Sequence, residues 1–149
     1  MSFQLVLLAL IAVSVLGSLA IVLANSSRIP RVAVGLQAGT VPPLLDLEGG
    51  ARFGLKNYTA PMGRLRIWSD GLEVTAIASR ASMAWSDIQH AVLIQPLIPV
   101  GMGVEFQVPG KARVTFWGSR ADCLRALELC ETNGVSVKRR RELRVCPGI

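Results

Sequence analysis

Few side chains in this 149-residue chain could act as a nucleophile or a base. His90 is the only histidine, and Ser86 and Asp87 stand just before it. A Ser-His-Asp arrangement needs a hydroxyl and a carboxylate that converge on the imidazole in space, which sequence neighbours on an extended strand need not do. We therefore interpret His90 as a structural or surface residue and predict no catalytic residues and no enzyme. A deep polar pocket that joins His90 to a carboxylate would favour an enzyme instead.

The cysteines do not have the spacing of a metal site. Cys123 and Cys130 fall on a predicted helix, seven positions apart in the sequence, which separates them by about 10 Å along its axis. One zinc ion cannot bridge that distance, so we predict no metal and no cofactor. We interpret both as small core residues. With Cys146 the chain has three cysteines, and an unpaired set is typical of a reducing compartment.

Positive charge concentrates at the carboxyl end of the chain. The formal net charge is +6, and residues 138–149 carry five basic side chains against Glu142, or +4 of that total. We predict that this run contacts a lipid or protein partner, and a solvated tail is the alternative. A nucleic-acid site is not expected, because no aromatic side chain interleaves with the run. The basic residues are Lys138, Arg139, Arg140, Arg141 and Arg144.

The amino-terminal segment is strongly apolar. Residues 5–24 contain no charged side chain, and as a helix they would be about 30 Å long, the thickness of the hydrocarbon core of a bilayer. We predict a transmembrane helix over residues 1–25. A cleaved signal peptide is the alternative, but the segment lacks a basic start and exceeds the usual apolar core of about 7–15 residues.

Charges beside this segment predict its orientation. Arg28 and Arg31 follow it, and no basic residue precedes it. The positive-inside rule then places the amino terminus outside and the carboxyl-terminal part in the cytoplasm. The expected location is the cell membrane, with a single pass. Residues 26–49, which include a stretch rich in Pro and Gly, are predicted to be a juxtamembrane linker and loop.

Alternating apolar and polar residues predict antiparallel strands in the middle of the chain. In "RLRIWSDGLEVTAIA", two such runs flank Asp70-Gly71, which favours a type I′ turn. "GVEFQV" and "KARVTFW" form a second predicted hairpin around Pro109-Gly110. Trp68 and Trp117 are expected on outward faces, either as contacts with a partner or packed beneath the linker or the loop of residues 39–50.

The period changes in "SRADCLRALELCETNG". Ser119 is the predicted N-cap, Asp122 follows three residues later as in a capping box, and Gly134 suits the end of a helix. We therefore predict a helix over residues 119–133 that covers the open end of a bent sheet. Its apolar stripe consists of Cys123, Leu124, Leu127 and Cys130.

The stretches "LRIWSDGLEV", "MAWSDIQHAVL" and "GVEFQV…ARVTFW", followed by one amphipathic helix, resemble the pleckstrin-homology (PH) superfold in its bacterial PH-like and GRAM-like branches. The resemblance covers residues 50–137. It implies a seven-stranded bent barrel with a carboxyl-terminal helix, and binding of a lipid headgroup or a protein. Phosphoinositide-binding members carry basic residues around the first hairpin turn. The segment 69–71 has none, so inositide recognition is not expected.

The expected fold class is therefore mainly β (α+β), with a PH-like domain between the transmembrane helix and a basic tail at 138–149. The expected function is a membrane-anchored, non-catalytic binding or scaffold module. Its partner would be a protein or an anionic lipid of the inner leaflet, met through the basic tail and the two outward tryptophans. A structural accessory subunit of a larger membrane complex is the alternative.

Overall fold

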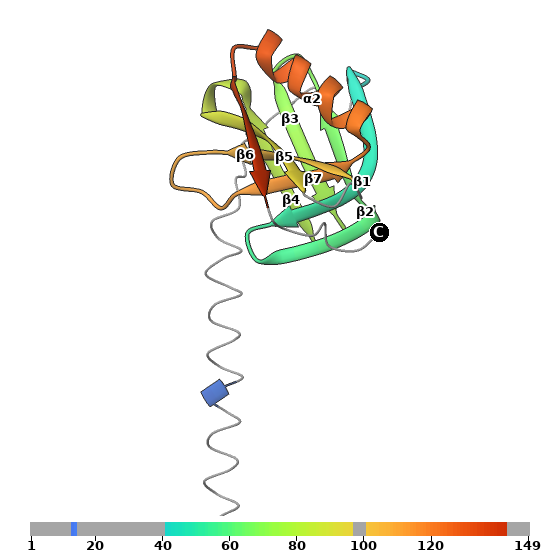
Figure 1. The fold of residues 1–149 in the computed structure, drawn as a ribbon, viewed down its shortest axis with the longest axis vertical. Helices are drawn as coiled ribbons and strands as arrows, with labels where there is room; N and C mark the ends of the chain where they lie inside the picture. The colour runs from blue at the N-terminus through green and yellow to red at the C-terminus, as the bar shows by residue number, and fades with distance from the viewer. Residues whose placement is uncertain (1–12, 15–40, 97–100, 143–149) are drawn as a thin grey trace, which may run out of the picture.

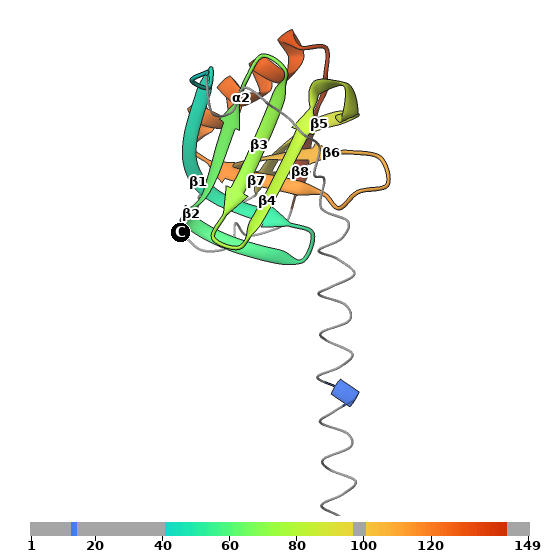
Figure 2. The same ribbon diagram turned by 180° about the vertical axis from the view of Figure 1, so that it is seen from behind.

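The computed structural model describes residues 13–14, 41–96 and 101–142 (Figures 1 and 2). Its main body is one sheet that curls into a half-barrel. The strands are β1 (Leu45–Phe53), β2 (Lys56–Ile67), β3 (Gly71–Ala76), β4 (Ser79–Ala84), β5 (His90–Pro96), β6 (Met102–Gln107), β7 (Val114–Gly118) and β8 (Ser136–Glu142). A single turn of 3-10 helix, Trp85–Asp87, links β4 to β5, and the helix α2 (Arg120–Thr132) lies between β7 and β8.

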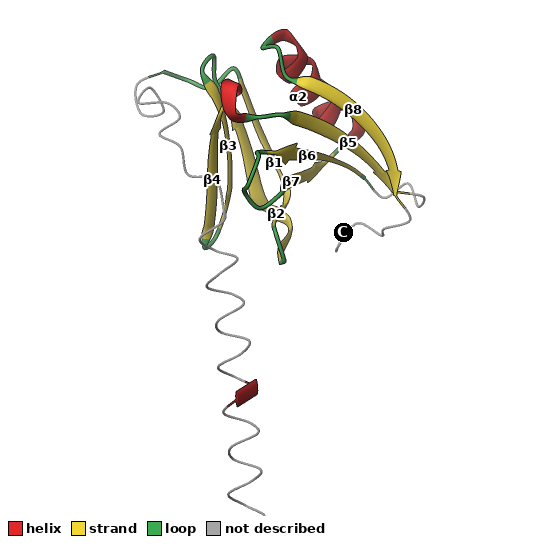
Figure 3. Ribbon diagram, turned by 90° about the vertical axis from the view of Figure 1, so that its left-hand side faces the viewer, coloured by secondary structure: helices red, strands yellow, loops and turns green. Residues whose placement is uncertain are grey.

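The order of the strands across the sheet is β4-β3-β2-β1-β7-β6-β5-β8. All neighbours are antiparallel except β5 and β8, which run parallel. Figure 3 shows β4 at one edge and β8 beside β5 at the other, with α2 across one end of the curled sheet. A parallel neighbour requires a long connection, and here β6, β7 and α2 supply it.

The predicted fold class is wrong in its outline, although the chain is mainly β. The expectation was a transmembrane helix followed by a seven-stranded barrel with a helix as its final element. Instead the sheet has eight strands and remains open, and the chain continues beyond α2 into β8. Within the described ranges, no helix combines the length and apolarity needed to cross a membrane. The predicted transmembrane segment lies outside those ranges, apart from Val13 and Ser14.

The core lies on the concave side of the sheet. Alternate residues along the strands point inward, and Phe53, Phe106 and Phe116 are completely buried there. On α2, Cys123, Ala126, Leu127 and Cys130 face the same core. Leu124, which the predicted stripe included, is instead 39% exposed. The helix is needed because a curled sheet alone leaves one end of its apolar face open to water.

The ends of α2 follow the signals in the sequence. Ser119 Oγ accepts a hydrogen bond from the Asp122 amide at 3.1 Å and donates one to the Asp122 carboxylate at 2.6 Å. This satisfies an amide that the first turn of a helix leaves unpaired. After the helix, Gly134 has a φ of 81°, a conformation that glycine adopts without the steric penalty of a side chain. The predicted helix is therefore confirmed.

Both predicted hairpins are present, but one turn differs. Gly110 has a φ of 70° between β6 and β7. At the other hairpin, β2 ends at Ile67 and β3 begins at Gly71, so residues 68–70 connect them. The Trp68 amide donates to the Gly71 carbonyl at 2.8 Å. No described residue other than glycine has a positive φ, and Gly71 has none either, which excludes the predicted type I′ turn.

The pairing of β1 with β2 is irregular at the point where β7 joins the other edge of β1. Gly49 is opposite Gly63 of β2, and the next residue, Gly50, is opposite Trp117 of β7. The register between β1 and β2 shifts at this point. A Cβ on Gly63 would lie 2.6 Å from the carbonyl carbon of Gly50, and a Cβ on Gly49 would lie 2.0 Å from the Trp117 carbonyl oxygen. At Gly63, β2 lies too close to β1 for a side chain, and at Gly49, β1 lies too close to β7, so space requires glycine at both positions.

This crowding predicts an order of stability for two neighbouring alanine variants. Gly49→Ala should lower the free energy of unfolding by roughly 3 kcal/mol, because its methyl group meets backbone that cannot rotate away. Gly50→Ala should lower it by only about 1 kcal/mol, because its nearest atom, the Tyr58 carbonyl oxygen, is 3.0 Å away. Neither glycine has a positive φ, so the comparison isolates space from backbone strain. Chemical unfolding followed by tryptophan fluorescence measures both, and equal losses would contradict the explanation.

Candidate functional site

Within the ranges that the structure describes, the few reactive side chains are not gathered into a catalytic group. His90 begins β5, and its Nε2 lies 2.9 Å from Lys138 Nζ of β8. An ammonium group can only donate, so Nε2 accepts this hydrogen bond. The other ring nitrogen, Nδ1, is buried without a hydrogen-bond partner in the described part of the chain. His90 thus contacts a basic side chain of the neighbouring strand rather than a carboxylate, which differs from a Ser-His-Asp arrangement.

The cysteines of α2 are buried thiols. Burial raises the pKa of Cys130 to about 12, so this side chain stays protonated and is a poor nucleophile. Cys123 Sγ donates to the Met102 carbonyl at 3.3 Å. Over the described ranges, no three residues of the types His, Cys, Asp and Glu lie close enough together to hold a metal ion. Cys146 lies outside the described residues.

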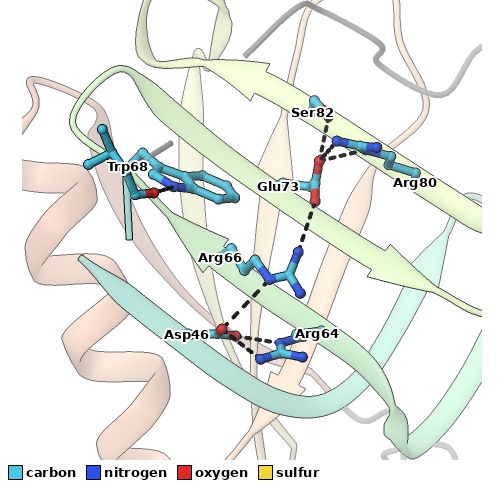
Figure 4. A network of polar contacts seen from close by, with 8 residues as sticks. Asp46, Arg64, Arg66, Trp68, Glu73, Arg80 and Ser82 are labelled. Carbon is cyan, nitrogen blue, oxygen red and sulfur yellow. Dashed lines mark hydrogen bonds and ion pairs between the residues drawn. The ribbon is translucent and has the colours of Figure 1, made fainter. Parts of the chain in front are cut away.

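Trp68 does not present the outward contact surface that was one of its two interpretations. It is only 3% exposed, and its indole Nε1 donates to the Val41 carbonyl at 3.3 Å (Figure 4). The residue lies just beyond the end of β2, where the turn interrupts the alternation of inward and outward positions. The other interpretation, packing beneath the segment that precedes β1, describes its contacts correctly.

Trp117 lies on the convex side of the sheet and is partly exposed. Its neighbours across the sheet are Gly50 of β1 and Gly103 of β6. A Cβ on Gly103 would lie 2.7 Å from the indole ring, so the ring covers the space that this glycine leaves. Its Nε1 is buried without a hydrogen-bond partner among the described residues. Trp117 therefore has a structural role, because its ring covers Gly103 of β6, and the residue remains partly accessible.

The convex face of β1 to β4 carries a chain of ion pairs that spans four strands (Figure 4). Arg64 donates from Nε and Nη2 to the two carboxylate oxygens of Asp46 at 2.6 and 2.7 Å. Arg66 stands between two acids, 3.6 Å from Asp46 and 3.9 Å from Glu73. Their carboxylates therefore offset most of the positive charge of this face.

Glu73 is the buried centre of the same network. Glu73 is only 3% exposed. Its Oε2 accepts hydrogen bonds from Arg80 Nε at 2.5 Å and from Ser82 Oγ at 3.2 Å. A buried carboxylate is tolerable only when charged donors surround it. The same principle applies on β6, where Glu105 is 7% exposed and lies 3.6 Å from Arg113 Nη1. These acids belong to the structure of the sheet.

Strand β8 has a different charge pattern. Lys138, Arg139 and Arg140 are exposed, and Arg139 forms no ion pair with a described residue. Lys138 and Arg140 are opposite Val92 and Ile94, whereas Arg139 is opposite Leu93, so basic side chains emerge on both faces of the strand. We refer to these three exposed residues of β8 as the basic edge.

Sequence reasoning found the residues of the basic edge but assigned them to a tail. Residues 136–142 instead form a strand, which includes Arg141. Arg144 lies outside the described residues. Val135 is buried and Val137 is partly buried against the core. That Val-Ser-Val alternation directly after Gly134 was the available signal for a strand. The last residues of the predicted linker, 26–49, likewise belong to a strand, because β1 begins at Leu45.

Neither the protein-family models nor the curated proteins contain a match to this chain. The candidate site therefore depends on the geometry alone. One cavity formed by described residues has a volume of about 560 Å³ and is lined by Thr75 to Arg80 of the β3–β4 hairpin. It contains no histidine, cysteine or carboxylate. The basic edge is thus a cluster of charged side chains that is exposed to solvent and does not pack in the core.

The ion pairs of β1 and β2 predict a dependence of stability on pH. The hydrogen bond from Arg64 lowers the pKa of Asp46 below its ordinary value of 3.8. A carboxyl group with a lowered pKa stabilises the fold above that ordinary value, and the stabilisation disappears as the pH falls through the lower pKa of the folded state. The free energy of unfolding of the unaltered chain should therefore exceed that of Asp46→Asn at about pH 6, and the difference should shrink as the pH falls below 3.8. Urea unfolding across this range measures the difference, and a gap that stayed constant with pH would contradict it.

Proposed function

We propose that this domain is a non-catalytic binding module that contacts an anionic partner through the basic edge. The observation that carries the proposal is the placement of three exposed basic side chains on seven-residue strand β8, at the border of the sheet. Lys138 and Arg140 emerge on one face of the strand, two residues and therefore about 7 Å apart. This separation is within the Debye length of about 8 Å at physiological salt, so these two charges act on a partner together, while Arg139 extends the positive charge to the other face.

The distribution of acids elsewhere supports this site over the rest of the surface. Arginines of β2 and β4 point toward Asp46 and Glu73, and Arg113 toward Glu105. Their positive charge is already directed to carboxylates of the same chain. Arg139 has no such partner among the described residues, so its guanidinium group retains its capacity to bind an external anion.

The absence of a reactive cluster in the described residues leaves binding as the better-supported class. His90 contacts an ammonium group, and both helical cysteines are buried in the core. The resemblance to PH-like domains points in the same direction, since it implies binding rather than catalysis. A curled sheet followed by a helix is compatible with that resemblance without being specific to it. An accessory subunit of a larger complex would use the same edge, with a constant partner.

The proposal predicts that removal of charge from the basic edge weakens binding to a polyanion more than removal of the same charge elsewhere. The variant Lys138→Gln, Arg139→Gln, Arg140→Gln should bind immobilised polyglutamate roughly tenfold more weakly at about 50 mM salt, because it loses three exposed contacts of up to about 1 kcal/mol each that do not add fully. The unaltered chain should lose most of that difference in about 0.5 M salt. Surface plasmon resonance with the full-length chain measures both.

A matched control removes the same charge from exposed positions outside β8. The variant Lys111→Gln, Arg120→Gln, Arg125→Gln changes three exposed residues of the β6–β7 turn and α2. It should retain at least half of the affinity for polyglutamate. Thermal unfolding of all three chains shows whether each variant is folded. Equal loss of binding in the two variants would mean that net charge, and not this strand, attracts the anion.

A further inference from the structure

We propose that the basic edge accepts an acidic, extended protein segment as an additional strand of the sheet, paired with β8 through the backbone. This inference rests on the proposed function, because it identifies the anionic partner and the way in which it binds. It goes further by assigning the backbone of β8 a part in recognition. The evidence is the regularity of the edge, its charge, and the positions of the acids in the chain.

The backbone of β8 is suited to pair with another strand. Seven consecutive residue pairs join it to β5, from His90–Ser136 to Pro96–Glu142, without a shift in register. In the sheet of the described residues, β8 has β5 as its one neighbour. Alternate N–H and C=O groups along its other side therefore point away from the sheet, which is the template that strand addition uses. The strand contains no proline and no bulge that would interrupt this template.

The opposite edge of the sheet, β4, lacks the same attraction for anions. Arg80 is the one ionisable residue in the sequence of β4, and Glu73 of the neighbouring strand accepts a hydrogen bond from it. Its charge is thus offset within the sheet. The basic edge has three cations over consecutive positions. Both borders offer backbone groups, but only β8 combines them with a charge that selects an acidic partner.

The chain itself does not supply a segment that matches the basic edge in charge. All ten acidic residues lie between positions 46 and 142, and none occurs in residues 1–40, 97–100 or 143–149. A strand donated from any of those segments would bring no carboxylate to the edge. The occupant that charge complementarity favours is therefore a segment of another protein.

A second copy of the chain is disfavoured by the same charges. If two β8 strands paired edge to edge, their lysines and arginines would face one another, and like charges directly opposite each other destabilise a strand pair. Positive charge on an edge strand is a common means of preventing such self-association. Here it also leaves the edge open to a strand of opposite charge.

The two faces of β8 define the sequence that a partner should have. Lys138 and Arg140 emerge on the convex face of the sheet and Arg139 on the other face. A partner strand with acidic residues at every second position would meet only one of these sets. A run of three or four consecutive acidic residues would place carboxylates on both faces. We therefore expect a short acidic run in an extended segment, flanked by residues that favour strands.

Methylation of the backbone of a peptide separates pairing from charge. The probe is a nine-residue peptide of four consecutive glutamates flanked by threonines and valines, bound to the full-length chain in solution. Two N-methylated versions carry methyl groups on alternate amides, in one phase or in the other, and keep every charge. Strand addition predicts that one phase weakens binding roughly tenfold or more, because its lost amides faced β8, and that the other phase changes it less than about twofold.

Amide hydrogen exchange on the same complex gives a second measurement. The peptide should slow exchange at alternate residues of β8 within 136–142, and the Lys138→Gln, Arg139→Gln, Arg140→Gln variant should lose that protection together with binding. Equal binding of the parent and both methylated peptides would overturn strand addition and leave a charge contact, so the proposed function would survive. Absence of binding to both the peptide and polyglutamate would overturn the proposed function as well.

Two other occupants are outcomes of the same experiment. Binding to phosphatidylglycerol vesicles that depends on the basic edge, without binding to the peptide, would replace the protein segment with a lipid surface and overturn the proposal. A dimer seen by sedimentation, disrupted by the edge variant and insensitive to the peptide, would assign the edge to a second copy and would likewise overturn it.

Discussion

The close approach of β1 to its two neighbours, β2 and β7, at Gly49, Gly50 and Gly63 is the constraint on which the arrangement of the sheet depends. An irregularity in the register of paired strands bends the strand and increases its twist. β1 pairs with β2 on both sides of a register shift between Gly49 and Ala51, and β7 joins its other edge from Gly50 onward. The bend joins β4-β3-β2 to β6-β5-β8 around a single core. Phe116 beside Gly49 and Trp117 over Gly103 then fill the space on the two sides of β7.

Local signals in the sequence were sufficient for elements whose causes are local. Ser119, Asp122 and Gly134 mark the ends of α2, and alternation around Pro109-Gly110 marks the hairpin of β6 and β7. What they do not encode is which strands become neighbours. The segment 45–49 appeared to be a loop because of its Pro and Gly neighbours. Its glycines instead lie where neighbouring strands come too close together for side chains, which is a relation between residues that are distant in the sequence.

The error at β8 has a related cause. A run of lysine and arginine reads as a solvated tail when only its own composition is considered. Its strand conformation depends on pairing with β5, nearly fifty residues earlier in the chain. Trp68 shows the same limit, because its burial depends on the segment around Val41 that crosses over it. The candidate site could therefore be predicted by residue type, whereas its geometry required the long-range contacts.

The basic edge and the ion-pair network represent two uses of charge on one sheet. On β2 to β4 each arginine has a carboxylate close to it, and this pattern fits strands that must pack side by side. On β8 the positive charge is left in excess at the border, where burial is low and desolvation costs little. Excess charge at an edge keeps identical copies apart, and the same repulsion disappears when the approaching strand is acidic. Protection against self-association and selection of an acidic partner therefore follow from the same three side chains.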